Sequence, residues 1–160
     1  SDLEILKYLR EHEYPWDKWT GDDAAEGGHL ECLKYLHENG YPWGKWVCAK
    51  AAENGHFECI KYLLENGAPW NAWTCTNVIK NGHLEILKCA HENGATWNVW
   101  TCDYAAKFGN LEIFKYLITN GCPYYWQVCK IASNNDHTNI LDWMLESGNC
   151  KCVGRYHPSK

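Results

Sequence analysis

The chain repeats the same pattern of residues every 27 positions, and this period constrains its fold more than any single residue does. Most copies carry two tryptophans three residues apart, followed by a Gly-His pair that becomes Gly109-Asn110 and Asp136-His137 in the last two copies. The first tryptophan column contains Trp16, Trp43, Trp70, Trp97 and then Tyr124, and the second contains Trp19, Trp46, Trp73 and Trp100. Such self-similarity indicates a repeat architecture in which each copy is one supersecondary unit stacked on its neighbours. We therefore expect an extended surface rather than an enclosed site.

Each copy predicts two short helices. In the copy that begins at Trp73, apolar residues recur at helical spacing, and we expect the Thr74 hydroxyl to cap the first helix. Gly82 can end that helix in the left-handed conformation. Residues 83–93 then predict a second helix with one apolar face. No segment alternates apolar and polar residues at period two, so we expect an all-α fold without a sheet.

We expect the repeat boundaries to follow the second tryptophan column. They divide the chain into residues 1–18 (a partial N-terminal repeat with a second helix and a loop), 19–45, 46–72, 73–99, 100–126, 127–148 (a degenerate C-terminal repeat) and 149–160 (an irregular tail). Terminal repeats are expected to deviate, because one of their faces has no neighbouring repeat. Since the chain lacks an initiating Met and Ser1 falls inside a repeat, we expect a piece of a longer protein.

The charge of the chain bears on the class of partner. The formal net charge is -5 and the pI is about 5.9, which argues against nucleic acid and anionic membranes as partners. No apolar run approaches the roughly 18 residues that a membrane-spanning helix needs, so we expect no membrane span.

Ten cysteines raise the question of disulfides, but their positions disfavour them. Equivalent helices of stacked repeats lie about 8–10 Å apart, whereas a disulfide needs Cα atoms within about 7 Å. One column contains Cys48, Cys75, Cys102 and Cys129, and another contains Cys32 and Cys59. We therefore expect buried thiols and a reducing, intracellular compartment, namely the cytoplasm.

The clearest copy carries Ala-Ala-x-x-Gly-His-x-Glu at residues 51–58, followed by Lys-Tyr-Leu-Leu-Glu-Asn-Gly-Ala at residues 61–68. Residues 24–31 match the first motif, and residues 105–112 match it with Asn in place of His. In these motifs the chain resembles ankyrin repeats, and the resemblance covers nearly the whole sequence. It implies an ankyrin-like helix-turn-helix solenoid.

Two departures from the ankyrin pattern matter. The usual unit has about 33 residues, and the residues missing here follow the Gly-Ala turn, where ankyrins place a β-hairpin finger. The usual Thr-Pro-Leu-His start is also replaced by Trp-Thr-Cys. The chain is therefore similar to the short, finger-less ankyrin variety of giant viruses and some protists. This likeness implies no β-hairpin fingers, and it implies the host-cell cytoplasm if the protein is viral.

The tryptophan columns have two interpretations. We expect them to replace the hairpins structurally, with rings packed along the stack and with room for one tryptophan of each pair to be half exposed. The alternative is an exposed aromatic ladder that grips a sugar or a peptide.

In ankyrins the concave face is built by the first helices, so the resemblance implies a protein–protein interaction module that binds its partner there. The exposed first-helix positions differ between copies here, while the core column beside them stays Cys or small. The alternative is that solvent-facing residues vary without binding anything. The candidate partner-binding residues are Asp23, Lys50, Glu53, Asn54, Asn77, Lys80, Asn81, Tyr104, Lys107, Phe108 and Ile131. Of these, Tyr104 and Phe108 are the best anchor candidates, since exposed aromatic pairs tend to be hot spots.

Two other functions are open. A repeat stack without caps can associate head to tail through apolar ends, such as the one that carries Leu3, Leu6 and Leu9. Finger-less ankyrin proteins of giant viruses also include substrate-recruiting arms of ubiquitin ligase adaptors. A sugar or small-molecule binder would rest on the tryptophans alone.

The sequence gives little support for a catalytic site or a metal site. No nucleophile elbow, phosphate loop or His-Glu-x-x-His helix is present, so we expect no enzyme and no cofactor. We expect structural roles for the Gly-His histidines, because repeats hold them too far apart to share a metal. Cys150-Lys151-Cys152 with His157 is the one metal-like cluster, and it lacks the second paired motif of a zinc site. We therefore expect no metal.

Overall fold

The structure is a computed structural model that describes residues 2–150. Within these residues the chain forms eleven α-helices and no strand, which confirms the all-α prediction. The chain divides into two compact units, Ser1–Ala95 (unit 1) and Thr96–Lys160 (unit 2). Each unit is built from helix pairs, and each is described by itself below.

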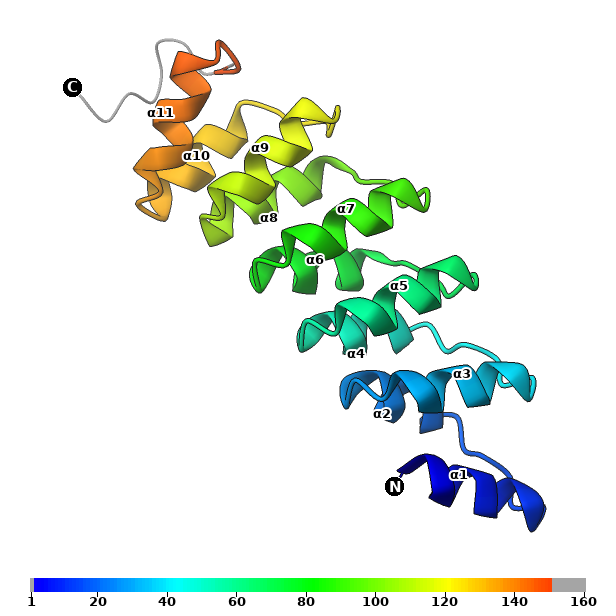
Figure 1. Ribbon diagram of the computed structural model, residues 1–160. Coiled ribbons are helices and arrows are strands. Elements are labelled where there is room, and N and C mark those ends of the chain that lie inside the picture. The colour runs from blue at the N-terminus through cyan, green and yellow to red at the C-terminus, as the bar shows by residue number, and fades with distance from the viewer. Residues whose placement is uncertain (1, 151–160) are drawn as a thin grey trace. The chain divides into compact units, whose positions relative to one another are not determined.

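The described part of unit 1 contains seven helices in two layers (Figure 1). They are α1 (Asp2–Glu11), α2 (Thr20–Glu26), α3 (Leu30–Glu38), α4 (Val47–Glu53), α5 (Phe57–Glu65), α6 (Ala72–Lys80) and α7 (Leu84–Glu92). The first helices α2, α4 and α6 pack on one another in chain order, and so do the second helices α1, α3, α5 and α7. This is the stacking that the 27-residue period predicts.

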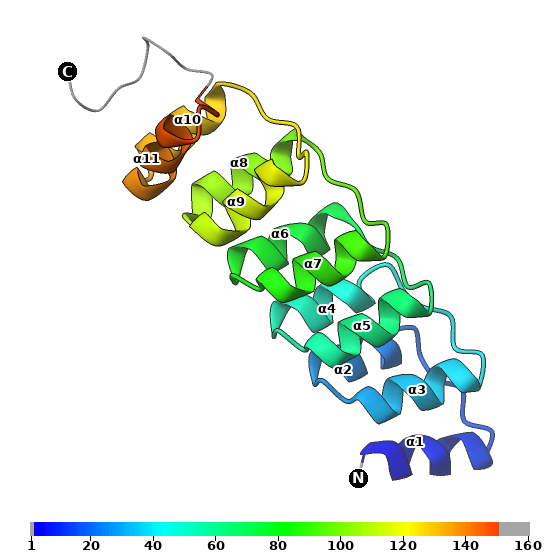
Figure 2. The same cartoon turned by 45° about the horizontal axis from the view of Figure 1, so that its top comes forward.

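The described part of unit 2 contains two helix pairs of the same kind. They are α8 (Val99–Phe108) with α9 (Leu111–Thr119), and α10 (Gln127–Asn134) with α11 (Thr138–Glu146). The first helices α8 and α10 pack together, as do the second helices α9 and α11. In each unit the tight turns within repeats lie along one edge, and the loops between repeats lie along the other (Figure 2).

The turn between the two helices of a repeat explains the recurring Gly-His pair. A Cβ at Gly55 would lie 2.7 Å from the His83 ring, and a Cβ at Gly28 would lie 2.6 Å from the His56 ring. The glycine of one repeat thus leaves room for the histidine of the next. The turn glycines also have positive φ, as predicted for Gly82, a region that glycine adopts without strain. The φ values are +70° at Gly28, +71° at Gly55, +74° at Gly82 and +75° at Gly109.

Helix α6 begins earlier than the sequence predicted. The expectation that Thr74 caps α6 is wrong, because α6 begins at Ala72 and Thr74 is buried inside it. Asn71 is the cap, and its side-chain oxygen accepts a hydrogen bond from the Thr74 backbone N–H at 3.0 Å. Asn98 caps α8 in the same way, in a capping box with Thr101. The carboxamides satisfy amides of the first turn that would otherwise lack partners.

The cysteine columns belong to the core, as expected. Cys48, Cys102 and Cys129 are fully buried on the first helices, and eight of the nine described cysteines are buried thiols. Burial raises the pKa of the Cys48 thiol to about 12, because the apolar surroundings disfavour the thiolate. Such a side chain acts as a small apolar group in the packing.

The two tryptophan columns have different environments. The first column packs, since the Trp16 ring meets Tyr35 edge to face at 6.2 Å and the Trp97 ring meets Tyr116 at 6.1 Å. In the second column Trp46 is half buried, but Trp73 and Trp100 are 63% and 60% exposed, which is more than the half exposure expected. These rings project from the first turns of α6 and α8.

Candidate functional site

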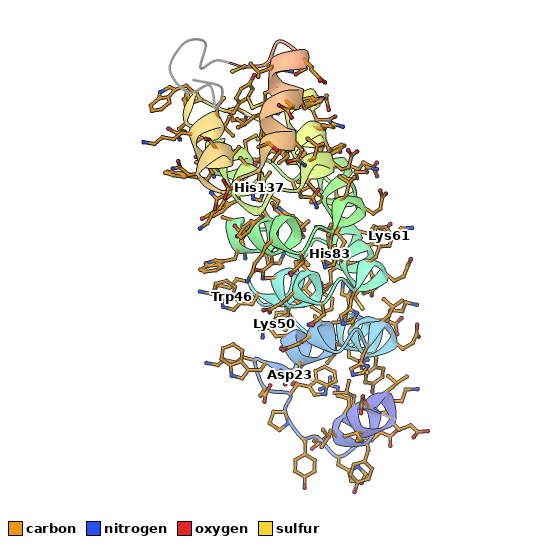
Figure 3. All side chains as sticks on the ribbon, turned by 90° about the vertical axis from the view of Figure 1, so that its left-hand side faces the viewer. Asp23, Trp46, Lys50, Lys61, His83 and His137 are labelled. Atoms are coloured by element: carbon orange, nitrogen blue, oxygen red, sulfur yellow. The ribbon has the colours of Figure 1, made fainter. Side chains whose placement is uncertain are left out.

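The second tryptophan column and the predicted binding residues share one face of the first helices. A residue four positions after the tryptophan lies on the same side of a helix, as do residues seven and eight positions after it. Figure 3 shows this side of unit 1 with Asp23, Trp46 and Lys50, while Lys61 of the second helix α5 lies on the opposite side. The first-helix face comprises Trp19, Asp23, Glu26, Trp46, Lys50, Glu53, Asn54, Trp73, Asn77, Lys80 and Asn81 in unit 1, and Trp100, Tyr104, Lys107, Phe108 and Ile131 in unit 2.

In unit 1 this face carries charges of both signs that pair between repeats. The Lys50 ammonium on α4 donates to the Glu26 carboxylate on α2 at 2.8 Å. Next to it, the Lys45 ammonium lies 4.9 Å from the centre of the Trp46 ring, and that ring meets Trp73 edge to face at 6.4 Å. Neighbouring repeats are thus joined at the surface by an ion pair and by ring contacts.

Two of the predicted binding residues form hydrogen bonds between repeats. The side-chain amides of Asn54 and Asn81 donate to the backbone carbonyls of Glu26 and Glu53, both at 3.3 Å. The His56 ring nitrogen Nε2 also lies 3.0 Å from the Glu26 carbonyl. Each carbonyl lies at the C-terminus of the preceding first helix, where carbonyls lack partners inside the helix. Asn54 and Asn81 therefore already have a structural role, although both side chains are exposed.

A buried carboxyl group underlies this face in unit 1. Asp22 of α2 is only 5% exposed, and burial raises the pKa of its carboxyl group, while the nearby Lys50 ammonium acts in the opposite direction. Gly44 allows the loop before α4 to come close, since a Cβ at this position would lie 3.3 Å from Asp22 Oδ1.

In unit 2 the corresponding positions are aromatic. Trp100, Tyr104 and Phe108 follow one another at four-residue spacing along α8. Trp100 is 60% exposed and Tyr104 is 36% exposed, and the Tyr104 and Phe108 rings are stacked at 6.2 Å with an interplanar angle of 14°. The Lys107 ammonium lies 5.8 Å from the centre of the Phe108 ring. We call Trp100, Tyr104 and Phe108 the aromatic stripe.

Asp103 of α8 occupies the repeat position of Asp22. It is 8% exposed, and its Oδ2 accepts a hydrogen bond from the Gln127 side-chain amide at 3.0 Å. Its other oxygen, Oδ1, is buried without a hydrogen-bond partner among the described residues. A buried oxygen of this kind is costly, so the surroundings of Asp103 are less well satisfied than a repeat core usually is.

The predicted binding residues lie at or near the surface in both units. Asp23, Glu53, Lys80, Tyr104 and Lys107 are exposed, and Lys50, Asn77, Phe108 and Ile131 are half buried. Their role in binding stays a prediction. The sequence interpretation missed the second tryptophan column as part of this face. The four-residue spacing from Trp100 to Tyr104 is the signal that could have revealed it.

Among residues 2–150, no group of three or more His, Cys, Asp or Glu side chains could hold a metal ion. The metal-like cluster noted in the sequence falls mostly outside this range, since Cys152 and His157 are not among the described residues. Across the described chain, every helix is too short or too polar to cross a membrane.

Comparisons with known proteins agree with this architecture. The model of the family described as ankyrin repeats (many copies) matches residues 48–91 and 75–118. Among solved structures, the chain is similar to the human ASB11 ankyrin repeat domain, with 23% sequence identity and a TM-score of 0.68. That match covers 80% of this chain and 68% of the ASB11 chain, and at this identity it bears on the fold. No curated protein matches.

Proposed function

Because this chain is an ankyrin repeat protein, we propose that it binds a partner protein through the first-helix face. Ankyrin repeats in general are protein–protein interaction modules. The choice of face rests on one observation. The core column that contains Cys48 stays Cys or small along the first helices, while the positions that face outward change from one repeat to the next.

The column that contains Asp23 illustrates this difference. It continues with Lys50, Asn77, Tyr104 and Ile131, which are acidic, basic, polar, aromatic and aliphatic in turn. The neighbouring core column holds Cys48, Cys75, Cys102 and Cys129. A fixed core with a different side chain at each exposed site favours selective recognition of one partner over non-specific association.

The test compares two lysines of the same charge on opposite sides of unit 1. The wild-type chain, Lys80→Glu on α6 and Lys61→Glu on α5 serve as bait for affinity capture from cell extract under reducing conditions. We expect a partner that binds the wild type and Lys61→Glu and is lost or weakened with Lys80→Glu. The Tyr104→Ala/Phe108→Ala double variant tests unit 2 in the same way.

Circular dichroism checks that each bait is folded before capture. All four side chains are at least partly exposed, so we expect changes in stability within about 0.5 kcal/mol for the lysines. Equal capture by all four baits would contradict the use of the first-helix face.

Self-association is a second candidate, supported by helix α1. No residue of α1 is buried, and Ile5 and Tyr8 are 58% and 57% exposed. If α1 stacks on a second copy, light scattering should give a mass that rises with concentration above 18.5 kDa, and Ile5→Glu should abolish the rise. A constant mass would exclude this role at the concentrations measured. The ubiquitin ligase arm has no specific observation in its favour.

We further propose a reducing, cytoplasmic location. Eight buried thiols in the described residues support it, since such thiols persist where disulfides do not form. Imaging of the tagged protein in its own cell would test this; residence in a secretory compartment would contradict it.

A further inference from the structure

The aromatic stripe on α8 differs from the same positions on every other first helix of the described chain. The equivalent residues are Trp19, Asp23 and Gly27 for α2, Trp46, Lys50 and Asn54 for α4, Trp73, Asn77 and Asn81 for α6, and Gln127, Ile131 and Asn135 for α10. Only α8 continues the exposed tryptophan with two further aromatic rings. At about 1.5 Å per residue, the stripe extends for roughly 12 Å along the helix.

The exposed charges on α8 and α10 are of one sign. They belong to Lys107 and Lys130, whereas Asp103, the one acidic residue of these two helices, is buried. In unit 1 the repeat positions of Lys107 and Ile131 hold Glu26 and Lys50, which form an ion pair. The equivalent pairing is therefore replaced in unit 2 by a lysine and an isoleucine.

Two rings of the aromatic stripe are already in contact before any partner binds. Tyr104 and Phe108 already stack on each other, and the Lys107 ammonium lies over the Phe108 ring. Aromatic side chains with few rotatable bonds lose little entropy when a partner covers them, and tryptophan and tyrosine are enriched among the residues that dominate binding energy. A partner that covers the stripe thus meets apolar surface at the centre and positive charge beside it.

We propose that the aromatic stripe with Lys107 is the docking site for an acidic protein segment that carries apolar side chains. The apolar side chains cover Trp100, Tyr104 and Phe108, and a carboxylate meets the Lys107 ammonium. This inference rests on the proposed function and names the chemistry of the partner. A single-stranded nucleic acid could also stack on aromatic rings. Charge favours the protein segment, because two lysines offer few phosphate contacts and the chain as a whole is acidic.

The experiment is a selection from a random-peptide display library on the immobilised full chain in reductant. Selected peptides are then synthesised and titrated against four proteins by fluorescence anisotropy. The variants are Trp100→Ala/Tyr104→Ala and Lys107→Glu, with Lys115→Glu on the second helix α9 as the matched charge control. We expect peptides rich in Asp, Glu and large apolar residues. Their affinity should fall about tenfold or more in the first two variants and stay unchanged in Lys115→Glu.

The salt dependence gives an independent readout. Binding of these peptides should weaken as the salt concentration rises, and Lys107→Glu should reduce that dependence. Selected peptides without an acidic excess, equal binding to all four proteins, or no selected peptide at all would overturn the proposal. So would tighter binding of oligodeoxythymidine than of any peptide, with the same sensitivity to Trp100→Ala/Tyr104→Ala.

The outcome also separates this inference from the proposed function. Peptides or partners that lose affinity with Lys80→Glu but not with the α8 variants would leave the first-helix face as the binding site and overturn only the role of the aromatic stripe. If the double aromatic variant does not fold, Lys107→Glu alone decides, because it changes one exposed side chain.

Discussion

The first helices of unit 1 and unit 2 share a core pattern but present different surfaces. On α2, α4 and α6 the exposed tryptophan is followed by charged, amide or glycine positions, and Lys50 pairs with Glu26 between repeats. On α8 the tryptophan is followed by Tyr104 and Phe108, with Lys107 beside them. The repeat period fixes where a side chain points, while the residue type at that point sets what it can bind.

The buried layer differs between the units as well. The apolar column of the second helices holds Leu33, Ile60 and Leu87 in unit 1, and Phe114 and Leu141 in unit 2. Phe114 is fully buried and meets Trp143 edge to face at 6.0 Å. Unit 2 therefore concentrates more of its apolar contact in one large side chain.

The largest expected effect comes from removing that side chain. Phe114→Ala should lower the free energy of unfolding by about 3–5 kcal/mol, and Leu33→Ala in unit 1 by about 2–5 kcal/mol. Because each repeat contacts its neighbours only, hydrogen exchange should show loss of protection mainly in α8–α11 for the first variant and mainly in α2–α5 for the second. Equal loss across both units in both variants would show that they unfold together.

The helix caps give the next largest effect. Asn98→Ala should cost about 0.5–2 kcal/mol of unfolding free energy, because it removes the side-chain oxygen that accepts from the first turn of α8, while the backbone N–H at this position still donates to Thr101. Asn71→Ala is the matched change in unit 1, where the Asn71 side chain accepts from Thr74 and also donates to the Lys45 carbonyl. We expect the larger loss there, because this second bond is removed as well. Urea denaturation measures both, and a larger loss from Asn98→Ala would reverse this ranking.

Replacing each of the two buried aspartates by asparagine should change the stability in opposite directions. Since burial raises the pKa of Asp22, its folded form binds a proton more tightly than its unfolded form. Stability is therefore lost as pH rises through the ordinary Asp range to the raised pKa, and Asp22→Asn should restore it at neutral pH. The neighbouring charges that contribute are those of Lys50 and Asp23.

Thermal melts across pH 3–7 check this prediction. The gain from Asp22→Asn should vanish at the acid end of the series, where the native carboxyl group is protonated in both states. Asp103→Asn should lower the melting temperature instead, because it replaces a carboxylate that accepts from Gln127 by an amide whose N–H groups need acceptors. A gain from Asp22→Asn that is constant with pH would contradict the role of its ionisation.

The arrangement of helices was predictable from the sequence, whereas the surface was predictable only in part. Periodic apolar residues and the Gly82 turn report directly on backbone geometry, so they indicated the helix pairs correctly. The start of α6 was missed because Thr74 and Asn71 are both good capping residues, and only the backbone decides which one accepts the bond.

The second tryptophan column was assigned to the packing for a similar reason. The 27-residue period alone does not show whether a column of tryptophans is buried or exposed. Only the position of Trp100 relative to the core, on the side of Tyr104 and away from Cys102, distinguishes the two. Likewise, the sequence could mark Asn54 as variable and exposed, but its bond to the Glu26 carbonyl depends on how neighbouring repeats stack.

The smallest expected effect concerns the ion pair that unit 1 has and α8 lacks. A double-mutant cycle of Lys50→Met and Glu26→Gln should give a coupling energy of about 0.2–1 kcal/mol, since both side chains are more than a third exposed. Salt should reduce this coupling, because water and ions screen the pair. Among the described residues, Lys107 on α8 forms no ion pair with a carboxylate. The change in unfolding free energy caused by Lys107→Met should therefore not depend on salt. A salt-dependent loss there would mean that Lys107 already serves an electrostatic contact within unit 2, which would leave less of its charge for a partner.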